Sequence, residues 1–349
     1  MDRIMEILRA GPPILADKTL TGGGLLMVAI VVLATAIFLL IFAHHEKNWF
    51  KHYLAIAVGV FIFEIFTSPM WINNHLGEFG YAYQDVSWVL TLGWSTLMLS
   101  IVFAVDYVWG HLHAWKRFLG YIAGMSVFGF LAEMLVMNLG LRSYSPEIAQ
   151  AISGLYFVNT PVDALYYIPV FSALVLGLYK YWTLIIDNRA VVPMRGGWGR
   201  RFALTAIAVF LFEFMIEPMV INTNFPAWSY IFHDISILLT FGWTALVWFS
   251  IYVVEALWPN FDLKEKFFLY LGVIGIFALP FETYLLTAGY RIYEGTSAGD
   301  AFSGIFLPLL HTPIEVAMAI PLYFALVLGF IGAWDIMLVN PLIRRQKTL

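Results

Sequence analysis

The stretch FIFEIFTSPMWIN at 61–73 returns 149 residues later as FLFEFMIEPMVIN at 210–222. The match extends without a gap over 61–97 and 210–246, so that DVSWVLTLGW in the first copy becomes DISILLTFGW in the second. Most apolar positions have drifted between the copies, whereas a glutamate, a proline and an asparagine keep their places. The chain is therefore built on an internal duplication.

The duplication continues towards the C-terminus, where TPVDALYYIPVFSALVLG at 160–177 matches TPIEVAMAIPLYFALVLG at 312–329. Of the 349 residues, 61% are hydrophobic and only 12% are charged, about half the charged fraction of an ordinary soluble domain. Apolar runs of about twenty residues recur, and each can cross a hydrocarbon core of about 30 Å. We predict an all-α, polytopic membrane protein with spans at 22–43, 51–72, 86–109, 117–140, 161–187, 201–222, 234–257, 265–289 and 313–338.

Each copy holds four predicted spans, and the first span stands outside both. Because four is even, the two tandem repeats have the same orientation, related by an axis along the membrane normal. We divide the chain into an N-terminal interfacial segment with the extra helix (1–50), a first repeat (51–190) and a second repeat (191–349). Within the first segment, the apolar run at 4–8 predicts a short interfacial helix.

Basic residues set the expected orientation. Of the 19 lysines and arginines, 14 lie in or beside the loops after spans 1, 3, 5 and 7 or in the C-terminal tail. The positive-inside rule then places the C-terminus in the cytoplasm, and we expect a bacterial inner membrane. The net charge of −4 argues against a nucleic-acid partner, and the absence of cysteine excludes disulfides and thiolate metal sites.

Polar residues retained in both copies are the candidates for function. They are Glu64/Glu213, Asn73/Asn222, Asp85/Asp234, Glu133/Glu282, Arg142/Arg291 and Asp163/Glu315, and all fall in the predicted non-cytoplasmic half. A charged side chain within a span costs about 2.5–3.5 kcal/mol, so it usually faces a cavity or a partner. We expect a polar pocket with some neutral carboxyls. A structural alternative is that each Arg pairs with the Glu nine residues before it.

The retained pair Asp106/Glu255 is an exception, because it lies near the cytoplasmic end of spans 3 and 7, where a carboxylate can reach water. The copies also differ: Ser68, Gln84, Ser145 and Asn159 of the first correspond to Glu217, His233, Glu294 and His311 of the second. This difference favours the second repeat as the one that carries chemistry. Four retained prolines within spans should kink them: Pro69, Pro169, Pro218 and Pro321.

Histidines cluster in the first third of the chain, at His44, His45, His52, His111 and His113. They lie at predicted cytoplasmic ends of spans and are not repeated in the second copy. We interpret them as interfacial anchors, and we expect neither a metal nor another cofactor.

The segments FETYLLTAGYRIYE (281–294) and PIEVAMAIPLYFALVLG (313–329) resemble the membrane lycopene cyclase domain of bacteria and fungi. That domain has an acidic residue, a glycine seven residues after it and an aromatic residue eleven residues after it, and a later helix that begins with Pro-x-Glu. These positions are Glu282, Gly289, Tyr293, Pro313 and Glu315 in the second copy, and Glu133, Gly140, Tyr144, Pro161 and Asp163 in the first. The pattern is also similar to that of membrane carotenoid hydratases. The family has tryptophan where this chain has Arg142 and Arg291.

The resemblance implies an enzyme that protonates a carbon–carbon double bond of an isoprenoid or carotenoid-like lipid, leading to cyclisation, isomerisation or hydration. Such a step needs a desolvated acid, a second carboxylate and aromatic walls. We predict Glu282 or Glu315 as the acid, with Glu213, Asp234, Glu133, Asp163 and Glu64 as the other catalytic carboxylates. The predicted substrate-binding residues are Arg291, Arg142, Asn222, Asn73, Asp85, His233, His311 and Glu217.

Two other functions fit the same features. Pseudosymmetric halves with buried carboxylates are also typical of proton-coupled transporters and lipid translocators. Short loops without a soluble domain are compatible with an anchoring subunit of a larger membrane complex.

Overall fold

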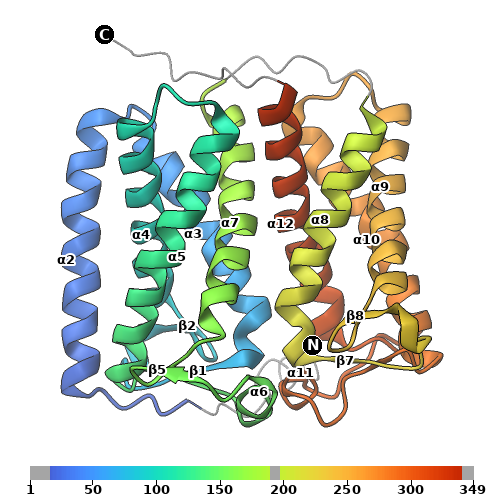
Figure 1. The fold of residues 1–349 in the computed structure, drawn as a ribbon, viewed down its shortest axis with the longest axis horizontal. Coiled ribbons are helices and arrows are strands. Elements are labelled where there is room, and N and C mark those ends of the chain that lie inside the picture. Colours follow the sequence, from blue (N-terminus) through green and yellow to red (C-terminus); the bar gives the residue numbers. More distant parts are fainter. Residues whose placement is uncertain (1–15, 189–196, 340–349) are drawn as a thin grey trace.

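The computed structural model describes residues 16–188 and 197–339. Within these ranges nine helices are long and apolar enough to cross a membrane, which confirms the predicted all-α, polytopic fold. They stand side by side in one bundle (Figure 1). The nine are α2 (Gly22–His45), α3 (Trp49–Thr67), α4 (Trp88–Val108), α5 (Ala114–Asn138), α7 (Ala164–Ile186), α8 (Trp198–Ile216), α9 (Ile237–Leu257), α10 (Leu263–Thr287) and α12 (Ile314–Val339). The expected interfacial run at 4–8 lies outside the described residues.

Short strands and turns lie at one end of the bundle, which we call the hairpin end; it is the lower end in Figure 1. Strand β1 (Trp71–Asn73) pairs antiparallel with β4 (Arg142–Tyr144), and β7 (Ile221–Asn222) pairs with β10 (Arg291–Ile292). Both pairings put the asparagine directly opposite the arginine. The remaining elements here are the hairpins β2 (Tyr81–Tyr83) with β3 (Val86–Ser87), β5 (Tyr156–Phe157) with β6 (Thr160–Pro161) and β8 (Tyr230–Phe232) with β9 (Ile235–Ser236), and the short helices α6 (Pro146–Ala151) and α11 (Ser297–Asp300).

The two repeats meet along their last spanning helices, α7 and α12, at the centre of the bundle (Figure 1). A Cβ atom on Gly177 would lie 2.7 Å from Cα of Phe330, and one on Gly329 would collide with Cα of Leu178. Only glycine allows this approach. Because positions 177 and 329 correspond in the duplication, the contact follows a pseudo-twofold relation between the repeats.

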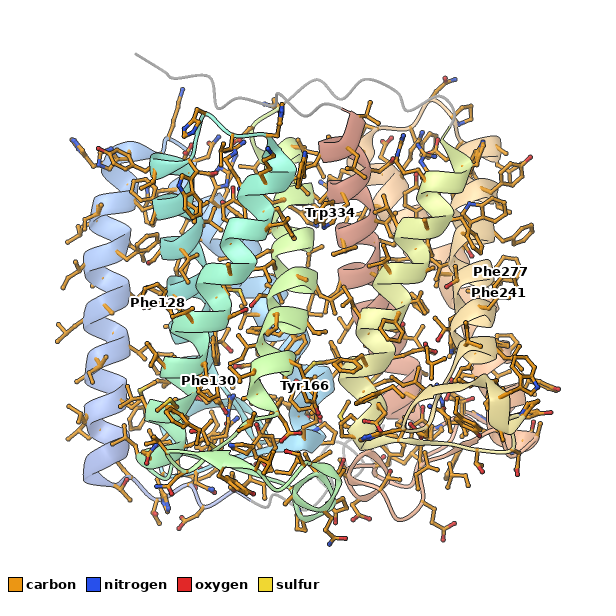
Figure 2. The ribbon with its side chains drawn as sticks, in the orientation of Figure 1. Phe128, Phe130, Tyr166, Phe241, Phe277 and Trp334 are labelled. Carbon is orange, nitrogen blue, oxygen red and sulfur yellow. The ribbon has the colours of Figure 1, made fainter. Side chains whose placement is uncertain are left out.

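The outside of the bundle is apolar. Phe128, Phe241 and Phe277 point outwards (Figure 2), and their exposed fractions are 55%, 60% and 41%. In contrast, Trp334 lies between the repeats and packs against Phe118 with ring centroids 5.2 Å apart. An exposed apolar surface of this extent fits a lipid environment.

Two of the four prolines expected to kink spans instead follow the ends of helices. Pro69 lies in a 3-10 turn, η1 (Ser68–Met70), directly after α3, and Pro218 lies in the equivalent turn η3 (Glu217–Met219) after α8. Proline lacks the N–H that would continue an α-helix and is well tolerated in the first turn of a new one. Pro169 and Pro321 do lie inside helices α7 and α12.

Candidate functional site

Each repeat contains a buried glutamate–arginine–asparagine cluster at the hairpin end. In the first, Arg142 Nη1 lies 3.1 Å from Glu133 Oε2, and its Nε donates to Asn73 Oδ1 at 2.9 Å. In the second, the corresponding distances are 3.3 Å (Arg291 to Glu282) and 3.0 Å (to Asn222). The strand pairings position the arginines opposite the asparagines. The ion pairs considered as a structural alternative from the sequence are therefore present.

The predicted aspartates Asp85 and Asp234 lie beside these clusters, in the turns of the hairpins. The Asn73 side chain donates to the backbone carbonyl of Asp85 at 2.8 Å, whereas the Asp234 carboxylate accepts the backbone N–H of Asn222. Burial raises the pKa of both aspartates above the ordinary value. Their contacts stabilise the hairpins.

Glu64 and Glu213 lie on α3 and α8, and a threonine of the neighbouring helix binds each of them. Thr91 donates to Glu64 Oε2 at 2.6 Å, and Thr240 donates to Glu213 in the same way. Oε1 of both glutamates is buried without a hydrogen-bond partner, and neither glutamate forms an ion pair within the described part of the chain. A buried oxygen without a hydrogen-bond partner costs free energy, so these two glutamates need an explanation beyond helix packing.

The first repeat contains a cavity of about 40 Å³ beside Glu64, which is room for a few water molecules. Glu133 and Arg142 also line it, and Oε1 of Glu133 has no hydrogen-bond partner. Six aromatic side chains complete the walls: Phe63, Trp71, Trp94, Tyr144, Tyr167 and Phe171. The cavity thus combines a carboxyl group with a partnerless oxygen, an arginine-paired carboxylate and aromatic rings.

In the second repeat, Glu282 corresponds to Glu133 and forms more hydrogen bonds. The Tyr293 hydroxyl donates to Glu282 Oε1 at 2.7 Å, so both oxygens of this carboxylate have donors. Two aromatic walls of the first cavity, Trp71 and Tyr167, correspond to Val220 and Ala319 here. We expected chemistry in the second repeat, but the aromatic cavity beside Glu64 lies in the first, where Glu133 also has a partnerless oxygen that Glu282 lacks.

Asp163 and Glu315 bind the loops that precede their helices. Ser153 donates its hydroxyl to Asp163 Oδ2 at 2.7 Å and its backbone N–H to Oδ1 at 3.2 Å. The backbone N–H of Ser303 donates to Glu315 Oε1 at 2.7 Å. Among the described residues no hydrogen bond connects these two acids to the arginine clusters.

The residues that differ between the copies occupy special turn positions. Gln84 and His233 have φ of 45° and 43°, and Asn159 and His311 have φ of 59° and 48°. Few non-glycine residues adopt such angles. Gln84, Asn159 and His233 lie in two-residue hairpin turns, which require them, and His311 lies in the loop between Phe306 and Pro313. His233 is half-exposed and its Nδ1 lies 2.8 Å from Glu217 Oε1. The backbone conformation of these turns thus favours asparagine, glutamine or histidine over most other residues, and the predicted role of His233, His311 and Glu217 in substrate binding stays a prediction.

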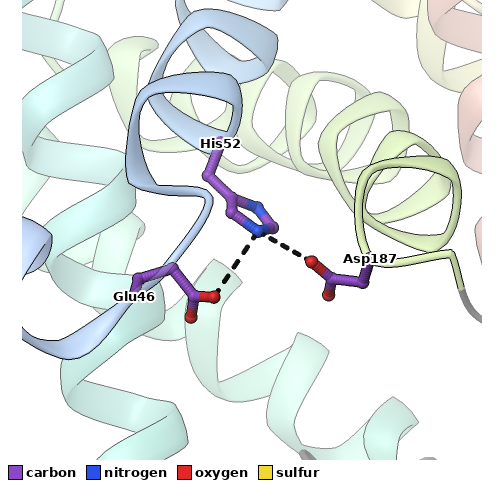
Figure 3. A group of neighbouring side chains, drawn as sticks. All are labelled: Glu46, His52 and Asp187. Atoms are coloured by element: carbon purple, nitrogen blue, oxygen red, sulfur yellow. Dashed lines mark hydrogen bonds and ion pairs between the residues drawn. The ribbon is translucent and has the colours of Figure 1, made fainter.

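One buried histidine, His52, belongs to a partly buried cluster at the other end of the bundle. His52 Nε2 lies 3.0 Å from Asp187 Oδ1 and 3.9 Å from Glu46 Oε1 (Figure 3). The ligand atoms of the three residues lie within 4.8 Å of one another, a spacing that one divalent cation can bridge. The sequence could not indicate this group, because its members are far apart along the chain.

From the sequence, Thr91 and Thr240 were not predicted as partners of Glu64 and Glu213. The duplication could have indicated them, because both repeats retain the threonine 27 residues after the glutamate. The hydroxyl of Tyr293 was likewise not recognised as a partner of Glu282. Comparisons with protein-family models, with curated proteins and with solved structures gave no match for this chain.

Proposed function

We propose that this integral membrane protein is an enzyme that protonates a carbon–carbon double bond of an isoprenoid or carotenoid-like lipid, without a redox cofactor. The reaction is a cyclisation, an isomerisation or a hydration. The observation that carries the proposal is the cavity of the first repeat, where the partnerless oxygen of Glu64 lies among aromatic rings and beside the Glu133–Arg142 pair.

In this proposal Glu64 is the acid. Its proton adds to one alkene carbon, and a carbocation forms on the other. Aromatic faces stabilise such a cation, and the Glu133 carboxylate, which pairs with Arg142, adds a negative charge nearby. Glu133 then accepts a proton from the carbon next to the cation, and water in the cavity returns it to Glu64. If water attacks the cation instead, the product is an alcohol.

The substrate reaches the acid from the bilayer. At about 40 Å³, the cavity admits an isoprenoid end group only when lining side chains move. Met215 of the second repeat lines one side. Its unbranched side chain has the flexibility for such a movement.

Mass spectrometry of lipid extracts from lycopene-accumulating cells tests the proposal. A new species of unchanged mass and shifted retention indicates cyclisation or isomerisation, and one heavier by a water indicates hydration. The product should be absent with Glu64→Gln and present with the matched control Glu213→Gln. An unchanged lipid profile, with the wild-type protein shown to be folded in the membrane, would overturn the carotenoid assignment.

Proton-coupled transport is the second candidate, because duplicated carboxylates occur at both ends of the bundle: Glu64 and Glu213 near the hairpin end, Asp106 and Glu255 near the other. Alternating access needs polar groups on both sides of the membrane. Purified protein in liposomes should then move protons only when a lipid-soluble substrate is added. Turnover of lycopene without proton movement would exclude transport.

A further inference from the structure

The partly buried trio of Glu46, His52 and Asp187 lies at the end of the bundle opposite the hairpins. Glu46 directly follows α2, His52 lies near the start of α3, and Asp187 directly follows α7. His52 is only 4% exposed, and its Nε2 faces both carboxylates (Figure 3). Three helices thus bring one imidazole and two carboxylates together, far from the site proposed around Glu64.

The distances between these ligand atoms suit one small cation. Nε2 of His52 lies 3.0 Å from Asp187 Oδ1 and 3.9 Å from Glu46 Oε1. Around a tetrahedral zinc ion, with bonds of about 2.0–2.2 Å, neighbouring ligand atoms lie about 3.4 Å apart. The two observed distances lie on either side of this value, so a small rotation of the Glu46 side chain completes the arrangement. Zinc accepts imidazole and carboxylate ligands together, whereas magnesium and calcium prefer oxygen ligands alone.

The second ring nitrogen of His52 has the contact that a metal-binding histidine needs. Such a histidine usually donates its other N–H to an oxygen, which fixes the tautomer and the orientation of the ring. The hydroxyl of Tyr179 lies 3.3 Å from His52 Nδ1, and the rings of Phe42 and Tyr179 pack edge-on against the imidazole. With Nδ1 donating to this hydroxyl, Nε2 directs its lone pair towards the two carboxylates.

A cavity of about 80 Å³ borders the trio, and the second repeat has a larger one, of about 840 Å³, at the same end. The bases that line the smaller cavity bind Asp106: Arg117 at 2.6 Å and Lys180 at 3.4 Å. Glu46 and Asp187 interact with other groups as well, as metal-ligating carboxylates usually do. The cavity has room for a few waters, which can complete the coordination of a cation with three protein ligands.

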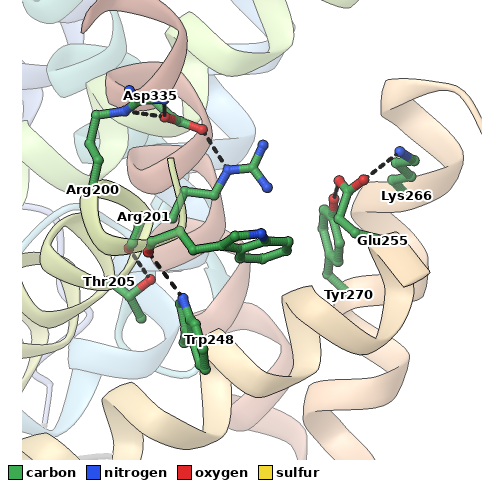
Figure 4. A network of polar contacts seen from close by, with 9 residues as sticks. Arg200, Arg201, Thr205, Trp248, Glu255, Lys266, Tyr270 and Asp335 are labelled. Atoms are coloured by element: carbon green, nitrogen blue, oxygen red, sulfur yellow. Dashed lines mark hydrogen bonds and ion pairs between the residues drawn. The ribbon is translucent and has the colours of Figure 1, made fainter. Parts of the chain in front are cut away.

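The second repeat has its own cation at the corresponding place. At the constant offset of 149, His52 corresponds to Arg201. Figure 4 shows that Arg201 donates to Asp335 Oδ2, at 2.8 Å, while Arg200 donates to Oδ1 at 2.7 Å. A guanidinium group has no lone pair for a metal, whereas an imidazole has one. The first repeat therefore has a metal ligand where the second has a fixed positive charge.

We propose that Glu46, His52 and Asp187 bind one divalent transition-metal cation of the zinc class. The metal joins α2 and α3 to the end of α7, and so fixes the extra N-terminal helix against the first repeat. This role differs from the interfacial anchoring that we expected for His52 from the sequence. The inference is independent of the chemistry proposed at Glu64.

Metal analysis of the purified full-length protein tests the site, with zinc as the probe and no polyhistidine tag. After incubation with zinc and removal of free metal, the wild type should retain one zinc per chain. His52→Arg, which introduces the side chain of the second repeat, should retain at least about tenfold less, because loss of an outer partner alone costs about 10- to 100-fold in affinity. The matched control is His111→Gln, at an exposed histidine at the same end of the bundle, and it should retain as much zinc as the wild type.

Two further measurements separate binding from folding. Zinc should raise the unfolding temperature of the wild type and of His111→Gln but not of His52→Arg, because a ligand that binds only the folded state stabilises it. Tyr179→Phe keeps all three ligands and should weaken zinc affinity about tenfold, through loss of the contact to Nδ1. If His52→Arg does not fold, His52→Gln provides the same comparison.

The alternative to a metal site is a simple hydrogen bond from His52 Nε2 to Asp187. Equal zinc retention by the wild type and His52→Arg, whether near one per chain or near none, would overturn the metal site.

Discussion

The two repeats contain corresponding parts, yet they differ in opposite ways at the two ends of the bundle. At the hairpin end, the first repeat has an aromatic cavity and a partnerless oxygen on Glu133, whereas Tyr293 satisfies the equivalent Glu282 in the second. At the other end, the cavity of the first repeat contains Lys180 and has a volume of about 80 Å³, whereas that of the second repeat is about 840 Å³. The first repeat thus has the aromatic cavity at the hairpin end, and the second has the larger cavity at the other end.

The largest effect should come from breaking the buried ion pairs. Removing one partner of such a pair costs about 3–5 kcal/mol, because a buried charge stays uncompensated. Arg142→Met should lower the unfolding temperature more than Arg291→Met, since Glu282 keeps the Tyr293 hydroxyl. Tryptophan fluorescence during heating in detergent measures the difference. Adding Glu133→Gln to Arg142→Met should restore part of the stability, and no restoration would contradict the account.

Replacing Tyr293 and Tyr144 tests the difference between Glu282 and Glu133 with a smaller expected loss of stability. Tyr293→Phe removes a hydrogen bond to a carboxylate, worth about 1.5–3 kcal/mol. Tyr144→Phe removes a hydroxyl that is not bonded to Glu133, whose Oε1 has no partner. The second repeat should therefore lose more stability than the first in the same thermal assay. Equal losses would mean that Glu133 and Glu282 are bound alike.

The contact between the repeats depends on two glycines. Gly329→Ala and Gly177→Ala should each cost about 1–3 kcal/mol, because the new methyl group overpacks against the backbone of the other repeat. The loss should be greater at Gly329, where the approach is closer. Unfolding temperatures in detergent measure both, and alanine at the exposed Val127 of α5 is a control. Unchanged stability at both glycines would contradict the close packing of α7 and α12.

The smallest effect is on pH dependence. Burial raises the pKa of Asp85 and Asp234, so the folded state keeps these protons to a higher pH than the unfolded state. Stability should therefore fall as pH rises from below the ordinary aspartate pKa through the raised value, and then level off. Asp85→Asn and Asp234→Asn should each reduce this slope in unfolding curves recorded across acidic pH. A slope unchanged in the double variant would contradict the burial of both carboxylates.

Hydropathy and the duplication were sufficient to predict the nine spans, and the spacing of Glu133 and Arg142 was sufficient to suggest their ion pair. A sequence contains no measure of space, so it could not show which repeat has the aromatic cavity. Asp106 and Glu255 were interpreted as carboxylates that reach water; their ion pairs with Arg117 and Lys266 were not predicted, because adjacent helices bring these residues together. The sequence likewise could not show that His233 and His311 adopt positive φ angles in their turns.

The central claim is that Glu64 of the first repeat, and not its counterpart Glu213, donates a proton to carbon. Membranes containing the protein can be incubated with lycopene in D₂O and the product analysed by mass spectrometry, since deuterium bound to carbon does not exchange back. The account predicts a product carrying one deuterium with the wild type and with Glu213→Gln, and no product with Glu64→Gln. A product without deuterium, or a deuterated product from Glu64→Gln, would contradict it.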